Sequence, residues 1–382
     1  MTVTVTGRAA AEQAASSSAA PAPAPAFPGL PEAPRAAHWV GPDLVAWRAT
    51  GGGEASVALR VSYTAGLDEA DVIEFPLERV EGGLPAEVRA RFPHLRGSAC
   101  FRLAASLPDE VLDLALRSQV VAVAKDRDGA FLAHTGVQMS GVLDACRRFD
   151  GPLGPRVLPD GRVEVRVWAP TAQEVELEVF PTADGPESVS VPMERGDRGE
   201  WAAQGPAEWL GRFYAFRSRC YHPTTGRVEA LVVTDPYSRS LSCDGRRSQF
   251  VDVDDPSLKP EGWDALEKPA LHSHVDASIY ELHVRDFSAE DATVPAGRQG
   301  KFEAFCELGS DGVRHLKRLQ AAGLTHIHLL PVYDFGSVPE RETDQAVAEV
   351  AGGFAPDSDE PQARVLAVAG GYMRPPRQVR ED

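Results

Sequence analysis

The fold is decided by two apolar runs, Ser278-Ile-Tyr-Glu-Leu-His-Val-Arg-Asp-Phe-Ser288 and Leu324-Thr-His-Ile-His-Leu-Leu-Pro-Val-Tyr-Asp-Phe335. Between them lies Asp311-Gly-Val-Arg-His-Leu-Lys-Arg-Leu-Gln-Ala-Ala-Gly323, whose apolar residues recur at helical spacing. Strand, helix and strand in this order predict one βαβ unit with parallel strands and a right-handed crossover. We expect both strands to be buried on their two faces, Asp311 to cap the helix and Gly323 to end it in the left-handed conformation.

Size and composition limit the classes of protein to which the chain can belong. Its 382 residues suffice for two or three domains, and 43% hydrophobic and 25% charged residues are ordinary for a globular protein. The net charge of −17 argues against a nucleic-acid partner, because phosphate binding needs concentrated Lys and Arg. No apolar run approaches the roughly 20 residues of a membrane span, so we expect no membrane partner.

The cysteine and histidine residues predict neither a metal site nor a disulfide framework, and we expect no cofactor. The five cysteines are far apart and form no C-x-x-C pair, which predicts free thiols in a reducing compartment. The histidines of the βαβ stretch lack an acidic partner at zinc-ligand spacing. We expect packing or hydrogen-bonding roles for these four, which are His283, His315, His326 and His328.

Composition divides the region before this stretch into a tail and two β-rich parts. Residues 1–36 are rich in Ala, Ser, Thr and Pro, which indicates a disordered tail or a transit peptide. Residues 37–150 contain alternating runs and one helical segment, Pro108–Arg117, which predicts a mixed, mostly β domain. Gly151-Pro-Leu-Gly-Pro155 marks a boundary, and the short strands after it predict a β-sandwich over residues 151–265.

Aromatic residues of the predicted sandwich are the candidates for ligand binding. Pyranose rings stack on flat apolar faces, so exposed rings on a sandwich would suit a sugar. The alternative is that these residues belong to the core, since two of them stand at the ends of alternating runs. The candidates are Trp168, Trp201, Trp209, Phe213 and Tyr214.

Several uninterrupted motifs resemble plant limit dextrinases and bacterial type I pullulanases, the α-1,6-glucan debranching enzymes of the α-amylase superfamily. They include Ile279-Tyr-Glu-Leu-His-Val-Arg-Asp-Phe-Ser-Ala289, Gly323-Leu-Thr-His-Ile-His-Leu-Leu-Pro-Val332, Val167-Trp-Ala-Pro-Thr-Ala-Gln173 and Asp235-Pro-Tyr-Ser-Arg-Ser-Leu241. The resemblance implies a multidomain chain: a mostly β N-terminal domain, a starch-binding-like β-sandwich, and an incomplete (β/α)8 barrel over residues 266–340. This barrel would hold only its first strand, first helix and second strand. Residues 341–382 depart from the family, and we expect a disordered tail.

The resemblance also implies a substrate and a chemistry. The substrate would be an α-glucan such as starch, amylopectin or a limit dextrin. The plant members imply a plastid location, with the cytoplasm as the alternative. Retaining cleavage needs two carboxyl groups about 5–5.5 Å apart. The family carries its carboxylates on the fourth, fifth and seventh barrel strands, which have no counterpart here, so we assign no catalytic residue.

Three carboxylates of the βαβ stretch remain, Glu281, Asp286 and Asp334. Asp334 follows the second predicted strand at the face where barrel enzymes bind ligands, so we expect it to line a substrate groove without a catalytic role. We expect Glu281 and Asp286 to pair with neighbouring groups. The resemblance thus predicts the N-terminal portion of a debranching hydrolase, inactive alone. The alternative is a non-catalytic α-glucan-binding or regulatory protein.

Overall fold

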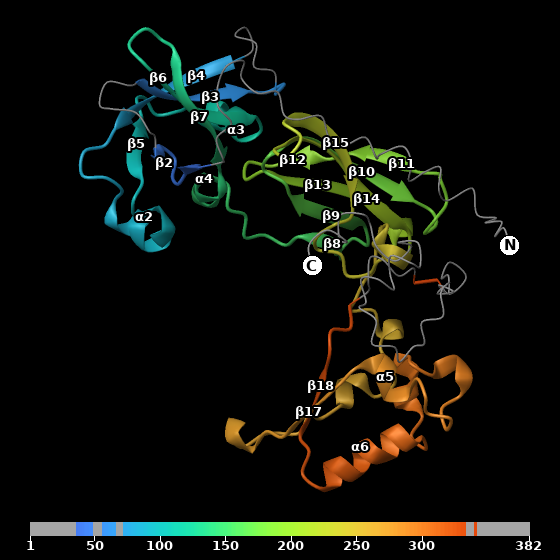
Figure 1. Cartoon of the computed structure of the whole chain (residues 1–382). Helices are drawn as coiled ribbons and strands as arrows, with labels where there is room; N and C mark the ends of the chain where they lie inside the picture. Colours follow the sequence, from blue (N-terminus) through green and yellow to red (C-terminus); the bar gives the residue numbers. More distant parts are fainter. Residues whose placement is uncertain (1–35, 49–55, 66–71, 334–339, 342–382) are drawn as a thin grey trace, which may run out of the picture. The chain divides into compact units, whose positions relative to one another are not determined.

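The computed structural model describes residues 36–48, 56–65, 72–333 and 340–341 (Figure 1). The chain divides into two compact units, Met1–Val253 and Asp254–Asp382. The first unit contains a β-barrel and a β-sandwich, and the second contains the βαβ stretch. None of the helices in the described part of the chain combines the length and the apolarity that a membrane crossing requires.

The first β-rich part is a closed barrel whose described strands follow the order β1-β2-β5-β4-β3-β6-β7. The ring closes where β1 pairs in parallel with β7, and the other pairs are antiparallel. The strands are β1 (Ala37–Trp39), β2 (Leu44–Trp47), β3 (Ser56–Ser62), β4 (Val72–Arg79), β5 (Ala99–Leu103), β6 (Gln119–Lys125) and β7 (Phe131–Gln138). The mostly β prediction for this part is confirmed.

Among the described residues, three short α-helices accompany the barrel: α2 (Ala86–Arg91), α3 (Asp109–Leu116) and α4 (Ser140–Cys146). The predicted helical segment is α3, and its Leu116 is buried in the barrel core beside Trp39 and Leu59. Helix α4 lies against β1 because Gly141 has no side chain. A Cβ atom there would come within 2.7 Å of the Val40 Cα atom.

Two sheets form the sandwich, one in the order β11-β10-β14-β15 with β16 beside β14, the other in the order β12-β13-β9-β8. Their inner faces bury Val165, Leu177, Phe216 and Phe250 in one core. The strands are β8 (Gly154–Val157), β9 (Val163–Trp168), β10 (Ala172–Phe180), β11 (Val189–Pro192), β12 (Glu194–Arg195), β13 (Glu200–Gly205), β14 (Phe213–His222), β15 (Arg227–Val233) and β16 (Ser248–Gln249).

Polar contacts join the barrel to the sandwich. Asp113 of α3 accepts a hydrogen bond of 2.6 Å from the Arg195 Nη2 atom, and its second oxygen lies 3.0 Å from the Arg117 Nη2 atom. The buried Arg147 guanidinium also approaches Asp113, at 3.4 Å. Gln173 of β10 donates to the backbone carbonyl of Tyr63, at 2.7 Å. The two β domains therefore share a charged, partly buried junction.

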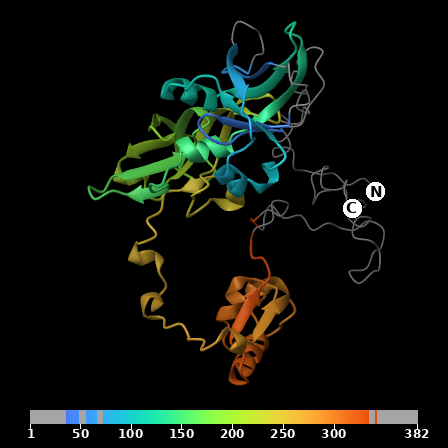
Figure 2. The same cartoon turned by 90° about the vertical axis from the view of Figure 1, so that its left-hand side faces the viewer.

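In the second unit, β17 (Ile279–Leu282) and β18 (His326–Leu329) pair in parallel, and α5 (Val284–Ser288) and α6 (Asp311–Ala321) lie between them in the chain. Figure 2 shows the two strands side by side with α6 below them. The parallel pairing and the helix between the strands agree with the prediction. Gly323 ends α6 with φ +109°, as expected.

Three details of this unit differ from the prediction. The run Ser278–Ser288 turns into helix α5 after Leu282, so it is a short strand followed by a helix. The helix cap is Ser310, whose Oγ atom accepts from the Val313 amide at 3.2 Å, because a serine one position earlier has the extended backbone that a cap needs. Both strands are largely exposed, since the described sheet has only these two members and each keeps an open edge.

Single turns of 3₁₀ helix complete the described structure. They are Pro93–Leu95, Ala207–Trp209, Cys243–Gly245, Pro256–Leu258, Trp263–Ala265, His274–Asp276, Ala296–Arg298 and Phe302–Cys306.

Candidate functional site

Three of the aromatic candidates are core residues. Trp201 and Trp209 are each 7% exposed, and Tyr214 is fully buried. Tyr214 stacks on the ring of Phe250 at 4.2 Å between centroids, and Trp209 stacks on the same ring at 5.3 Å. A sugar cannot reach these faces in the folded sandwich, so the expected sugar contact is corrected to a packing role. The alternative stated for the aromatic candidates, that they belong to the core, therefore describes these three residues.

The other two aromatic candidates are half-buried. The indole Nε1 atom of Trp168 donates to the carbonyls of Arg147 and Arg198, at 2.9 and 3.0 Å. Both bonds hold the indole at the junction with the barrel and occupy its one donor. Phe213 begins β14.

A buried carboxylate organises the loop that follows β15. Asp235 accepts a hydrogen bond of 2.8 Å from the Tyr214 hydroxyl and one of 2.8 Å from the Tyr237 amide. Its own amide donates to the Ser248 Oγ atom at 2.9 Å, and Ser238 Oγ donates to its carbonyl at 2.7 Å. Burial raises the pKa of Asp235, and the hydrogen bonds from the Tyr237 amide and the Tyr214 hydroxyl oppose that rise. Hydrogen bonds to the side chain and to the backbone of Asp235 thus hold this loop in place.

This anchored loop presents Tyr237 to solvent, with 52% of the residue exposed. Gly154 lies directly beneath it, with φ +81°, and a Cβ atom there would stand 2.9 Å from the Tyr237 carbonyl oxygen. An exposed ring on a fixed backbone has the form of a stacking platform for a pyranose. Sequence reasoning missed Tyr237 because it lies in a loop outside any alternating run. The signal available was an aromatic residue within Asp235-Pro-Tyr-Ser238.

Two of the three candidate carboxylates of the βαβ stretch are described, and each lies near a histidine. Glu281 lies 3.1 Å from the His328 Nδ1 atom, and Asp286 lies 3.8 Å from the His283 Nδ1 atom. Asp334, the expected groove residue, lies outside the described residues. Within the described ranges, no group of three His, Cys, Asp or Glu residues stands close enough to hold one metal ion.

Two family models match the chain. Residues 34–145 match the Pullulanase N2 domain, and residues 152–238 match carbohydrate-binding module 48, the isoamylase N-terminal domain. The first match covers the barrel, and the second covers most of the sandwich together with the loop of Tyr237. Both mostly β parts therefore have known counterparts.

Several proteins of known name that are similar to this chain are pullulanases. A chloroplastic pullulanase from Arabidopsis thaliana is 40% identical over 342 residues, 87% of this chain and 35% of that protein. A pullulanase from Klebsiella pneumoniae is 39% identical over 317 residues, 80% of this chain and 28% of that protein. The chain thus spans about a third of the length of these relatives.

Solved structures show the same likeness. A crystal structure of a Klebsiella pneumoniae pullulanase in complex with maltotriose matches 90% of this chain and 37% of that one, with a TM-score of 0.76 and 35% identity. The ligand-free form of that pullulanase has the same TM-score of 0.76 and covers 91% of this chain.

Proposed function

Since the chain carries a pullulanase N2 domain followed by a carbohydrate-binding module 48, we propose that it binds α-glucans such as starch, amylopectin and limit dextrins. The observation that carries the proposal is the exposed Tyr237 ring within the matched module. The backbone amide of Tyr237 donates to Asp235, and a pyranose would stack on the exposed ring. A neutral ligand also suits a chain with a net charge of −17.

Retention on insoluble amylopectin tests this proposal. Tyr237→Ala should weaken binding about tenfold, because it removes the stacking face, whereas Tyr237→Phe keeps that face and should bind like wild type. Val232→Ala is the matched control, since Val232 is also 52% exposed on the sandwich but has no ring. The measurement is the bound fraction against glucan concentration. Equal retention of Tyr237→Ala and wild type would refute Tyr237 as the platform.

We further propose that β17, α6 and β18 are the first elements of a (β/α)8 barrel and that the complete machinery hydrolyses α-1,6 bonds of glucans. The parallel pairing of β17 with β18 and the pullulanase relatives support this. Residues 1–382 alone should release no reducing ends from pullulan, because none of the described carboxylates is assigned a catalytic role. Clear turnover by the purified chain would contradict the expected inactivity.

A non-catalytic glucan-binding or regulatory role is the second candidate. It is favoured by the match of residues 152–238 to a carbohydrate-binding module, which can bind a glucan without cleaving it. Mixing the chain with a pullulanase polypeptide that lacks the corresponding N-terminal third separates the two functions. Restored hydrolysis favours a debranching role, whereas unchanged or inhibited hydrolysis favours regulation.

We also propose a plastid location, supported by the similarity to a chloroplastic pullulanase. A fusion of residues 1–36 to a fluorescent protein should enter plastids. Diffuse cytoplasmic fluorescence would favour the alternative.

A further inference from the structure

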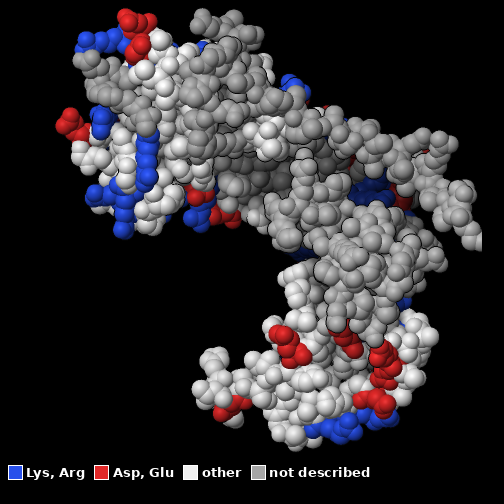
Figure 3. All heavy atoms as spheres, in the orientation of Figure 1, with Lys and Arg blue, Asp and Glu red and all other residues white. Residues whose placement is uncertain are grey.

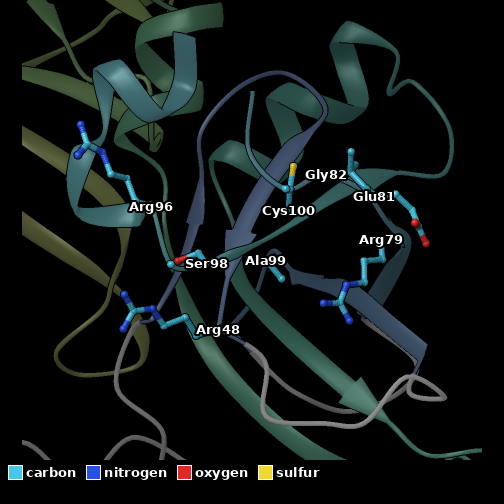
Figure 4. Close-up of a pocket in the computed structure, with 11 residues that line it drawn as sticks. Arg48, Arg79, Glu81, Gly82, Arg96, Ser98, Ala99 and Cys100 are labelled. Carbon is cyan, nitrogen blue, oxygen red and sulfur yellow. The ribbon is translucent and has the colours of Figure 1, made fainter. Parts of the chain in front are cut away.

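A cleft of about 850 Å³ opens on the barrel where β2, β4 and β5 end or begin. Its walls are Arg48 after β2, Arg79 at the end of β4, the turn of residues 80–83, and residues 96–100 leading into β5. Figure 4 shows Arg48 and Arg96 on one side of the cleft and Arg79 on the other, with Ser98 and Ala99 between them. The cationic groups therefore surround the space without meeting at one point.

The charges of this cleft differ from those of the surrounding surface. None of Arg48, Arg79 and Arg96 forms an ion pair with any residue that the structure describes. Glu81 is the one acidic residue among the described residues that line the cleft. Two exposed arginines of the barrel outside the cleft are paired: Arg91 with Asp144 at 2.8 Å and Arg102 with Asp43 at 3.0 Å. Figure 3 shows basic side chains gathered over the barrel. A cleft whose three arginines have no ion-pair partner among the described residues is unexpected on a chain with a net charge of −17.

The backbone around the cleft is also suited to an anion. The turn passes through Gly82 and Gly83 with φ +88° and +76°, and a Cβ atom at either would meet nothing within 4 Å. The amides of Gly82 and Gly97 donate to no acceptor in the described residues. Gly97 lets Arg48 lie across it, since a Cβ atom there would stand 3.0 Å from the Arg48 Nη2 atom. Guanidinium forks and free amides are the groups that hold phosphoryl oxygens in proteins.

We propose that this cleft binds phosphoryl groups, carried either by an α-glucan chain or by a small phosphorylated sugar. No aromatic residue is among the described residues that line the cleft, and these offer a neutral sugar no stacking face. The separation of Arg79 from Arg48 and Arg96 favours a ligand that extends across the cleft. The site lies in the barrel and is independent of Tyr237 in the sandwich.

Calorimetric titration of the full chain tests the site with three probes: inorganic pyrophosphate, a phosphorylated maltooligosaccharide and the same oligosaccharide without phosphate. We expect saturable binding of the first two at low salt and a loss of affinity as salt is raised. Tighter binding of the phosphorylated oligosaccharide than of pyrophosphate would identify the glucan as the carrier. The reverse order would identify a small phosphorylated ligand.

Variants separate the cleft from general charge effects. The double variant Arg48→Gln/Arg96→Gln should weaken pyrophosphate binding at least tenfold, because it removes two charge-assisted donors. Arg89→Gln is the matched control, since it removes an exposed arginine of α2 outside the cleft and should bind like wild type. Gly97→Val keeps every charge but displaces Arg48, and should also weaken binding.

The same titrations distinguish this proposal from the proposed glucan binding of the sandwich. Tyr237→Ala should leave pyrophosphate binding unchanged, whatever it does to amylopectin retention. Failure of both phosphorylated probes to bind, or equal affinity of wild type and the double variant, would overturn the phosphoryl site. The arginine variants are folded if their thermal unfolding midpoints equal that of the wild type.

Discussion

At the scale of single residues, Tyr214 illustrates how burial changes the role of a side chain. As an aromatic residue on a sandwich strand it was a candidate for stacking on sugar, yet it is fully buried and its hydroxyl donates to Asp235. Burial and the neighbouring carboxylate raise the pKa of Tyr214, so the hydroxyl keeps its proton and remains a donor. Its contribution to binding would be indirect, through the loop that presents Tyr237.

Tyr214→Phe should lower the free energy of unfolding by about 1–2 kcal/mol at pH 7. Burial raises the pKa of Asp235 above 3.8, so stability falls as pH rises from there through the folded pKa. The Tyr214 hydroxyl lowers the pKa of Asp235, so its removal raises that pKa further. Ionising Asp235 then costs more, and the variant should lose more stability at pH 7 than at pH 4. Urea unfolding at both values measures this. Tyr63→Phe, whose hydroxyl has no partner in the described residues, is the control, and equal losses at both pH values would contradict the mechanism.

At the scale of elements, close packing of backbone decides where α4 lies. The helix approaches β1 so closely that residue 141 can carry no side chain. Strand β1 is only three residues long but closes the barrel by pairing with both β2 and β7. The contact between α4 and β1 therefore supports the closure of the whole ring.

Gly141→Ala should destabilise the barrel by about 1–3 kcal/mol, the range found for an overpacked core. The new methyl group would stand 2.7 Å from the Val40 Cα atom and 2.9 Å from the Trp39 carbonyl oxygen, so the helix must shift. Amide hydrogen exchange should accelerate in β1 and β7 before β10 of the sandwich. Gly41→Ala is the control, because its Cβ atom would meet only the Leu44 Cβ atom, at 4.0 Å. If amide hydrogen exchange in β1 were unchanged, α4 would accommodate the methyl group without a loss of stability.

At the scale of the first unit, the Asp113 cluster couples the barrel to the sandwich. Arg117 and Arg147 come from the barrel side and Arg195 from the sandwich, and all three approach one carboxylate. The low exposure of this cluster protects it from screening by salt, unlike the exposed Arg91–Asp144 pair.

Asp113→Ala should cost about 3 kcal/mol, because it leaves partly buried guanidinium groups without their shared partner. Calorimetry should then resolve separate transitions for the barrel and the sandwich in place of one coupled transition. Asp144→Ala, which breaks an exposed pair, should change stability by less than about 1 kcal/mol. A single unshifted transition in Asp113→Ala would mean that apolar contacts alone join the two domains.

The sequence by itself determined the mostly β character of the first two domains and the order of elements around α6, because alternation and helical spacing are local properties of the chain. It also contained the motifs by which the chain resembles pullulanases. Only the tertiary structure decided which faces are covered: it closed the ring by pairing Ala37 with Val137, buried Tyr214 and left Tyr237 exposed. It likewise brought Arg48, Arg79 and Arg96 around one cleft. The exposure of a side chain depends on contacts with residues far away in the sequence, and a local pattern does not specify these contacts.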